Sequence, residues 1–221
     1  MKIIFIDTTH PKLIGDLKSR GFICDQAHGK SKSEILKIIK NYDGLVIRSR
    51  FKIDKIFINA AKKLKFIARA GSGTENIDIK YADKKNIKCF NAAEGNRQAV
   101  AEHALAMILN LINNIRVSDL EIRKGLWNRE KNRGFELSGK TIGIIGFGNT
   151  GSSFAKILEN FNVKILAYDK YKKNYKFKSS LGEILANSDI ISLHIPLTDE
   201  TKYLVNENFI DKAKKPFYII N

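Results

Sequence analysis

The fold is decided by residues 141–169, TIGIIGFGNTGSSFAKILENFNVKILAYD. This stretch begins with an apolar run typical of a buried parallel strand, continues through a glycine-rich turn into a helix, and ends in a second strand. Gly146, Gly148 and Gly151 have the spacing G-x-G-x-x-G. In this spacing the first glycine permits a tight turn, the second lets a pyrophosphate approach the backbone, and the third lets the helix pack closely on the strand. The stretch therefore predicts a parallel strand–helix–strand unit with a dinucleotide site.

Asp169 indicates which dinucleotide this site favours. It lies 18 residues after Gly151, at the end of the second strand, where a carboxylate can accept hydrogen bonds from both ribose hydroxyls. Its charge would also repel a 2′-phosphate, so the sequence predicts NAD as the cofactor. Lys170, Lys172 and Lys173 follow closely and leave NADP as the disfavoured alternative.

The length and composition of the chain indicate a globular protein of the cytoplasm. Its 221 residues, of which 43% are hydrophobic, suffice for one large domain or two ordinary ones. No apolar run reaches the roughly 18 residues of a membrane span, and residues 2–7 are too short for the apolar region of a signal peptide. Cys24 and Cys89 lie far apart without metal-ligand spacing. We therefore expect free thiols in a reducing compartment, and no metal site.

The net charge of +16 raises the question of a nucleic-acid partner. However, 30 of the 39 basic side chains are lysines, and they are scattered along the chain. Specific reading of bases favours arginine, and the abundance of Lys, Ile and Asn is explained by AT-rich codons. We therefore expect no nucleic-acid partner, whereas the basic surface would attract a small anionic substrate at low salt.

The first ninety residues alternate between strand and helix patterns, which is typical of a small parallel sheet. Strands are expected at residues 2–6, 44–48, 66–70 and 88–91, and helices at residues 11–20, 33–40, 53–62 and 77–85. The chain is thus predicted to be α/β, with a first domain at residues 1–92 and a second at residues 93–221.

The second domain opens with a predicted long helix at residues 98–123, which is apolar around much of its surface. Such a helix is expected to be buried on several sides, between domains or in a dimer contact. After Asp169 the patterns predict strands near residues 175–178 and at 189–195 and 217–221, and helices at 181–186 and near 207–214. A doubly wound sheet has about six strands, so we expect a sheet that is truncated after its fifth strand.

Five motifs together resemble the D-isomer-specific 2-hydroxyacid dehydrogenases, and most closely their D-3-phosphoglycerate branch. In chain order they are VIRS at residues 46–49, RAGSGTENID at 69–78, NAAEGNRQAVAE at 91–102, the dinucleotide unit, and DIISLHIPLTDETKYL at 189–204. The resemblance implies a flavodoxin-like substrate domain, a Rossmann-type NAD domain with a doubly wound parallel sheet, and a homodimer formed through the NAD domains. It implies an NAD-dependent oxidoreductase of 3-phosphoglycerate or 3-phosphohydroxypyruvate, in serine biosynthesis.

The resemblance also implies which residues of the first domain hold the substrate. Arg48, Ser49 and Arg69 match positions at the substrate, and the two arginines match those that face its phosphate. Guanidinium suits this task because it pairs bidentately with phosphate or carboxylate. Gly71 matches a loop whose backbone N–H groups hold the substrate carboxylate. A local structural role for Arg48, at a strand end, is the alternative.

For the cofactor, the resemblance adds five residues to the glycines and Asp169. Ser72 matches a position on the nicotinamide side of NAD. Asn149 and Thr150 match turn residues that donate to the pyrophosphate. Ile195 and Pro196 match an apolar shelf beneath the adenosine, for which ordinary core packing is the alternative.

The catalytic Arg, Glu and His of the family match no residue of this chain, because the resemblance places them after Asn221. None of His10, His28, His103 and His194 is predicted to be the general acid–base. We therefore expect these 221 residues to be inactive alone, as a fragment or a truncated product. Two other interpretations remain: a non-catalytic NAD-binding interaction protein, and a dehydrogenase of another 2-hydroxy acid such as glycerate or lactate.

Overall fold

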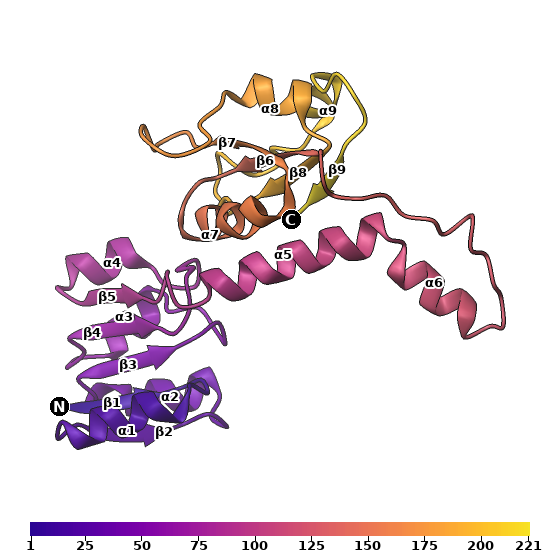
Figure 1. Cartoon of the computed structure of the whole chain (residues 1–221). Coiled ribbons are helices and arrows are strands. Elements are labelled where there is room, and N and C mark those ends of the chain that lie inside the picture. Colours follow the sequence, from indigo (N-terminus) through magenta and orange to yellow (C-terminus); the bar gives the residue numbers. More distant parts are fainter. The chain divides into compact units, whose positions relative to one another are not determined.

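All residues from 1 to 221 are described by a computed structural model. The chain divides into two compact units, Met1–Gly95 and Asn96–Asn221, each built on one sheet (Figure 1). Every strand pair in both sheets is parallel. The predicted α/β class with parallel sheets is therefore confirmed. The expected boundary after residue 92 falls in the segment between the last strand of the first unit and the first helix of the second.

The first unit is a five-stranded sheet with the order β2-β1-β3-β4-β5, the order of flavodoxin-like sheets. Its elements are β1 (Lys2–Phe5), α1 (Pro11–Ser19), β2 (Ile23–Gln26), α2 (Lys32–Ile38), η1 (Ile39–Asn41), β3 (Gly44–Ile47), α3 (Lys55–Ala60), β4 (Phe66–Arg69), α4 (Ile79–Lys84) and β5 (Lys88–Asn91). Helices cover both faces, because α2, α3 and α4 contribute to one apolar cluster and α1 to another.

Strand β2 was not predicted from the sequence, which gave this sheet four strands instead of five. Ile23–Gln26 is an edge strand of only four residues, ICDQ, with both ends exposed. So short a segment, with two polar residues, has neither the apolar run of a central strand nor a clear alternation. It pairs with β1 from Lys2↔Ile23 to Phe5↔Gln26.

The second unit is a four-stranded sheet with the order β7-β6-β8-β9. Its elements are α5 (Arg97–Ile112), α6 (Ile115–Ile122), β6 (Thr141–Ile145), α7 (Asn149–Leu158), η2 (Glu159–Phe161), β7 (Lys164–Tyr168), α8 (Leu181–Asn187), β8 (Ile190–Leu193), α9 (Glu207–Asp211) and β9 (Tyr218–Ile220). Helices α5 and α7 pack on one face of the sheet, and α8 and α9 on the other. The predicted unit β6–α7–β7 is confirmed, and β6 is buried on both faces.

The strand predicted near residues 175–178 is wrong, so the sheet has four strands and not five. Lys178 forms only a single bridge to Ala167 of β7. Phe177 has φ +65°, a left-handed conformation that cannot continue an extended strand. Tyr175 instead stacks its ring on Phe147, with the ring centroids 5.0 Å apart.

The single helix predicted at residues 98–123 is also wrong, because Asn114 breaks it into α5 and α6. Asn114 has φ +51°, and asparagine adopts this left-handed conformation more readily than most residues. One face of α5 is buried, through Ala101, Ala104, Ile108 and Ile112. No residue of α6 is buried, so the expected burial on several sides is not present within the chain.

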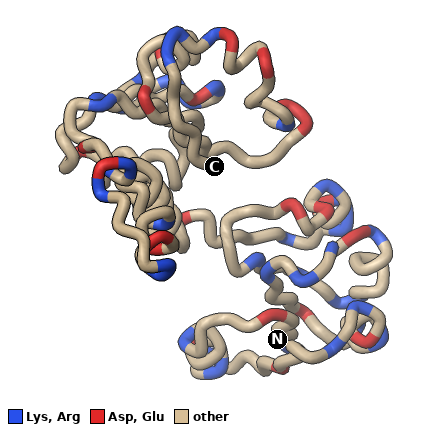
Figure 2. The backbone as a smooth tube through the Cα atoms, turned by 90° about the vertical axis from the view of Figure 1, so that its right-hand side faces the viewer, with Lys and Arg blue, Asp and Glu red and all other residues tan.

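The charged side chains are spread over both units. Figure 2 shows Lys and Arg along the whole backbone, interspersed with Asp and Glu, and not gathered into one stripe. Cys24 and Cys89 are free thiols. The structure contains no helix whose length and apolar character would let it cross a membrane.

Candidate dinucleotide site

The glycine turn after β6 is closely packed at its first and third glycines and open at the second. Gly146 has φ +93°, and a Cβ added to it would lie 2.5 Å from the His194 carbonyl oxygen. A Cβ on Gly151 would lie 2.0 Å from the Gly146 carbonyl oxygen, because α7 packs directly on the turn. A Cβ on Gly148 would meet nothing within 4 Å. The backbone at Gly148 is therefore open to a ligand, and this opening fits the close approach of a pyrophosphate.

The N-terminus of α7 has no capping side chain. Gly148 is the N-cap residue of α7 and has no side chain, whereas Ser180 caps the N-terminus of α8 with a capping box. The first N–H groups of a helix have no partner within the helix and carry the positive end of its dipole. Asn149 and Thr150, the predicted pyrophosphate contacts, form the first turn of α7. The turn and the helix start together suit a phosphate group.

Asp169 links the glycine turn to the turn that follows β7. Its Oδ2 accepts a hydrogen bond from the backbone N–H of Phe147 at 2.8 Å. Its Oδ1 accepts from the N–H groups of Tyr171 and Lys172, both at 2.9 Å. The predicted ribose ligand is thus also the residue that holds these two turns together.

The hydrogen bonds to Asp169 determine its charge and the number of acceptor positions that it has left for a ligand. Partial burial alone would raise the pKa of this carboxyl, but the bonds from Lys172, Phe147 and Tyr171 and the charge of Lys172 outweigh burial and lower the pKa. The group is therefore ionised at neutral pH. A carboxylate has about four acceptor positions. Three are used, which leaves one free acceptor position on Oδ2.

Sequence reasoning did not find Phe147 and Tyr175 beside Asp169, and it named Lys172 only as a nearby charge. The ammonium of Lys172 donates to the Phe147 carbonyl oxygen at 3.2 Å and lies 5.7 Å from the centre of the Phe147 ring. The hydroxyl of Tyr175 accepts a hydrogen bond from the backbone N–H of Asp169 at 2.8 Å. Phe147 fills a variable position of the glycine motif, Lys172 and Tyr175 lie outside it, and only the folded structure brings the three together.

The segment after β8 lies against the glycine turn. A Cβ on Gly146 would lie 2.8 Å from Cγ2 of Ile195, so this predicted adenosine contact does adjoin the turn. Ile195 is half-buried and Pro196 is exposed. The ring of His194 shares a hydrogen bond of 2.9 Å with the Ser192 hydroxyl, and burial lowers the pKa of His194 to about 4. His194 is therefore neutral at physiological pH.

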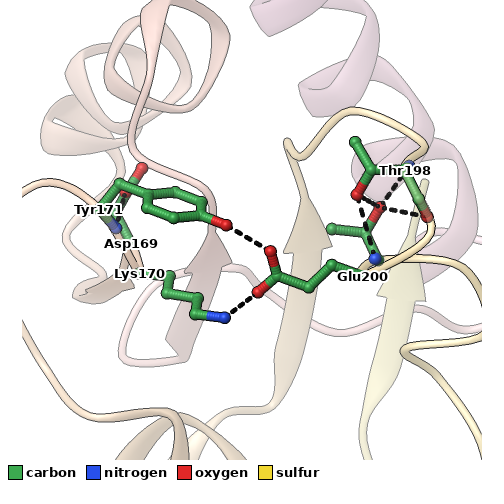
Figure 3. A network of polar contacts seen from close by, with 6 residues as sticks. Asp169, Lys170, Tyr171, Thr198 and Glu200 are labelled. Atoms are coloured by element: carbon green, nitrogen blue, oxygen red, sulfur yellow. Dashed lines mark hydrogen bonds and ion pairs between the residues drawn. The ribbon is translucent and has the colours of Figure 1, made fainter.

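A polar network joins the segments that follow β7 and β8 (Figure 3). The Glu200 carboxylate accepts from the ammonium of Lys170 on one oxygen and from the hydroxyl of Tyr171 on the other. Lys170 and Tyr171 come directly after Asp169. Nothing in the sequence pattern pointed to this network, since Glu200 lies 30 residues from Lys170.

A cavity of about 440 Å³ opens in the second unit beside the carboxyl ends of β8 and β9. His194 and Asn221 line it from the strand ends, and Val100 and His103 line it from α5. Ligands of doubly wound sheets bind outside the carboxyl ends of the strands, so this cavity lies at the expected edge.

The predicted substrate residues gather at one edge of the first unit. Arg48 and Ser49 follow β3 and are exposed, and Arg69 ends the neighbouring strand β4, where it pairs with Ile47. The backbone N–H of Arg48 donates to Asp7 Oδ2 at 2.6 Å. The local hydrogen bonds of Arg48 thus involve its backbone, and its guanidinium takes no part in them.

Arg69 and Gly71 lie against each other in this unit. A Cβ on Gly71 would lie 1.5 Å from Nη1 of Arg69, so the missing side chain gives the guanidinium its space. Nε of Arg69 is buried without a hydrogen-bond partner. A buried donor without a partner is costly, and an anion bound here would satisfy it. Ser72 follows on the same loop, and its carbonyl oxygen accepts from Asn91 Nδ2 at 2.6 Å.

Residues 105–221 match the family model described as the D-isomer specific 2-hydroxyacid dehydrogenase, NAD binding domain. The D-3-phosphoglycerate dehydrogenase of Archaeoglobus fulgidus is 34% identical over 227 residues, which cover 100% of this chain and 43% of that protein. The hydroxypyruvate reductase of Thermotoga maritima is 40% identical over 193 residues, which cover 86% of this chain and 63% of that protein. The chain thus spans about half the length of the curated relatives that it matches.

Among solved structures, an acyclic imino acid reductase in complex with NADPH and D-Arg is similar over the whole chain. The TM-score is 0.90 and the identity 28%, with 100% of this chain and 74% of that chain covered. A fold of this kind therefore accommodates NADPH in at least one relative, so the choice between the two nucleotides must depend on local residues.

Proposed function

Because the chain belongs to the D-isomer-specific 2-hydroxyacid dehydrogenase family, we propose that it serves the NAD-dependent oxidation of a D-2-hydroxy acid in the cytoplasm. The substrate pair is 3-phosphoglycerate and 3-phosphohydroxypyruvate, as in serine biosynthesis. The observation that carries the proposal is the open turn at Gly148, with the uncapped start of α7 behind it and the ionised Asp169 beside it. These three features are what a dinucleotide requires.

The cofactor would supply the hydride exchange at its nicotinamide, and the chain's own residues would bind and orient it. The first N–H groups of α7, at Asn149 and Thr150, would hold the pyrophosphate. Oδ2 of Asp169 would accept one ribose hydroxyl, and Ile195 with Pro196 would support the adenosine. The rest of the cofactor would extend toward the cavity between α5 and the ends of β8 and β9.

The first unit would hold the anionic substrate. Arg48 and Arg69 extend from adjacent strands at one edge, and Nε of Arg69 has no partner in the protein. Two guanidinium groups suit a substrate with both a phosphate and a carboxylate. The second candidate substrate is an unphosphorylated 2-hydroxy acid. The similarity of this chain to the hydroxypyruvate reductase of Thermotoga maritima supports it.

Two binding measurements on residues 1–221 test these proposals. NADH fluorescence should change on titration with the protein, and calorimetry should detect 3-phosphoglycerate but little glycerate. Arg69→Ala should abolish the preference for the phosphorylated acid and leave NADH binding unchanged. Equal affinities of the wild type for both acids would favour the second candidate, and a lack of NADH binding would refute the cofactor site. We expect no turnover of 3-phosphohydroxypyruvate by residues 1–221 alone.

The second unit also supports a homodimer formed through the NAD-binding unit. Apolar side chains of α6 are exposed, among them Ile115, Leu120 and Ile122, at 52%, 47% and 51% of their surface. Trp127, shortly after this helix, is 78% exposed. Exposed apolar side chains are found at protein–protein contacts, and a second copy of the chain would cover these.

A further inference from the structure

We propose that Glu200 biases the choice between NAD and NADP, because it occupies the ammonium of Lys170 and so denies a 2′-phosphate this counter-ion. The inference rests on the proposed cofactor site and assigns a specificity-determining residue to it. Glu200 lies on the segment after β8, outside the β6–α7–β7 unit that carries the glycine turn and Asp169.

The starting point is the charge of the turn after β7. Three lysines, Lys170, Lys172 and Lys173, lie within four residues after Asp169, and a cation beside the ribose is what a 2′-phosphate needs. In the structure two of the three ammonium groups are engaged elsewhere. Lys172 donates to the Phe147 carbonyl oxygen at 3.2 Å, and Lys170 forms an ion pair with Glu200.

Glu200 is held in position by its own segment. The N–H of Thr198 donates to the Thr201 hydroxyl at 2.8 Å, and the N–H of Thr201 donates to the Thr198 hydroxyl at 3.2 Å. The hydroxyl of Thr201 also donates to the carbonyl oxygen of Pro196, on the predicted adenosine shelf, at 2.5 Å. These bonds fold residues 196–201 into a compact turn, from which Glu200 reaches the residues beside Asp169 (Figure 3).

The electrostatics of this arrangement oppose a phosphate. The bonds from Lys170 and Tyr171 lower the pKa of Glu200, and the bond to Glu200 raises the pKa of Lys170. Both groups are therefore charged at neutral pH. The turn that carries Lys170 is thus flanked by two carboxylates, those of Asp169 and Glu200. A 2′-phosphate would meet both negative charges and no free ammonium from Lys170, whereas a 2′-hydroxyl meets no such repulsion.

The ion pair itself adds little to stability. The two side chains are 57% and 44% exposed, and exposed pairs contribute little because water screens them. Removing the Glu200 charge should therefore leave the fold intact and free the ammonium of Lys170. The freed group can then turn to a phosphate, with which it forms a charge-assisted hydrogen bond.

The test is a titration of residues 1–221 with NADH and with NADPH, followed by the fluorescence of the bound nucleotide. Glu200→Gln should strengthen NADPH binding about fivefold relative to NADH, a small change in Kd as expected for an exposed charge pair. Lys170→Gln added to Glu200→Gln should remove this gain. Glu159→Gln is the matched control, since Glu159 pairs with Lys176 at 2.7 Å with similar exposure and on the same unit.

Three outcomes would overturn the inference. The ratio of the two affinities could stay unchanged in Glu200→Gln, the gain could persist without Lys170, or Glu159→Gln could produce the same gain through net charge alone. Each of these leaves the cofactor site standing as long as the wild type binds NADH. A wild type that binds neither nucleotide would instead refute the proposed function, and the inference with it.

Discussion

Replacement of Gly148 by alanine tests the dinucleotide site with the least disturbance to the fold. Gly148 is the one glycine of the motif whose added Cβ meets nothing within 4 Å. Its φ is −78°, so alanine is not forced into a left-handed conformation. Gly146 and Gly151 would instead bring a Cβ to 2.5 Å and 2.0 Å from backbone oxygens. Gly148→Ala should therefore fold like the wild type and place a methyl group in front of the start of α7.

The loss of affinity can be estimated from the bonds that the methyl group prevents. A phosphate oxygen approaches a backbone N–H to about 2.9 Å, and a methyl group on Gly148 stands in this approach. At least one hydrogen bond to a charged group would be lost, at about 1.5–3 kcal/mol. This corresponds to an increase in the Kd for NADH of about 10- to 150-fold.

The assay combines an NADH titration with thermal unfolding of the same samples. Gly182→Ala is the matched control, because Gly182 lies in α8, where its nearest neighbour to an added Cβ is Ser180 Oγ at 3.9 Å. This control should bind NADH like the wild type and unfold at the same or a higher temperature, since alanine favours helix. Unchanged NADH binding by a folded Gly148→Ala would refute the role assigned to the open turn.

Three further predictions concern pH and association. The ring of His194, with a pKa of about 4, should stay neutral in NMR titrations from pH 8 to 5. Because the unfolded chain gains this proton near pH 6.5, the contribution of His194 to stability should fall as the pH drops from about 6.5 to about 4. A titration midpoint near 6.5 in the folded protein would contradict the burial of the ring. Asp169 has a lowered pKa, so the stability difference between wild type and Asp169→Asn should be greatest at neutral pH and should vanish as acid protonates the folded carboxyl. Denaturant unfolding at several pH values measures this difference. A difference independent of pH would refute the stabilising role of the ionised carboxylate. Leu120→Asp, on the exposed side of α6, should convert the proposed dimer to monomer in sedimentation velocity, and an unchanged dimer would place the contact elsewhere.

The parts of the fold that the sequence predicted are those with a local signal. Strand β6 has a continuous apolar run, and its glycine turn has fixed spacing, so the unit from β6 to β7 follows directly from residues 141–169. The missed strand β2 is too short and polar to give such a signal, and the two other errors arise where a single residue overrides a pattern. Asn114 ends a run that is otherwise helical, and Phe177 turns to positive φ within an apparent strand. A propensity averaged over several residues does not detect such changes.

The site was predictable in its motif and not in its supporting contacts. The prediction that Asp169 binds the ribose follows from its place after the second strand. Its bond to the N–H of Phe147 spans 22 residues, and the network of Glu200 spans about 30. Contacts between residues so distant in sequence depend on how the strands are ordered in the sheet, and no spacing or periodicity encodes that order.

The hydrogen bonds of Asp169 also separate its role from that of Glu200. Because three backbone N–H groups already fix this carboxylate, the glycine turn and the turn after β7 hold their positions before a cofactor binds. Such preorganisation lowers the ordering cost of binding, and it serves NADH and NADPH alike. Loss of Asp169 should therefore weaken both nucleotides through the shape of the turn, in addition to any effect of its charge. Glu200 makes no bond to the glycine turn, so its loss should change the ratio of the two affinities and leave NADH binding nearly constant.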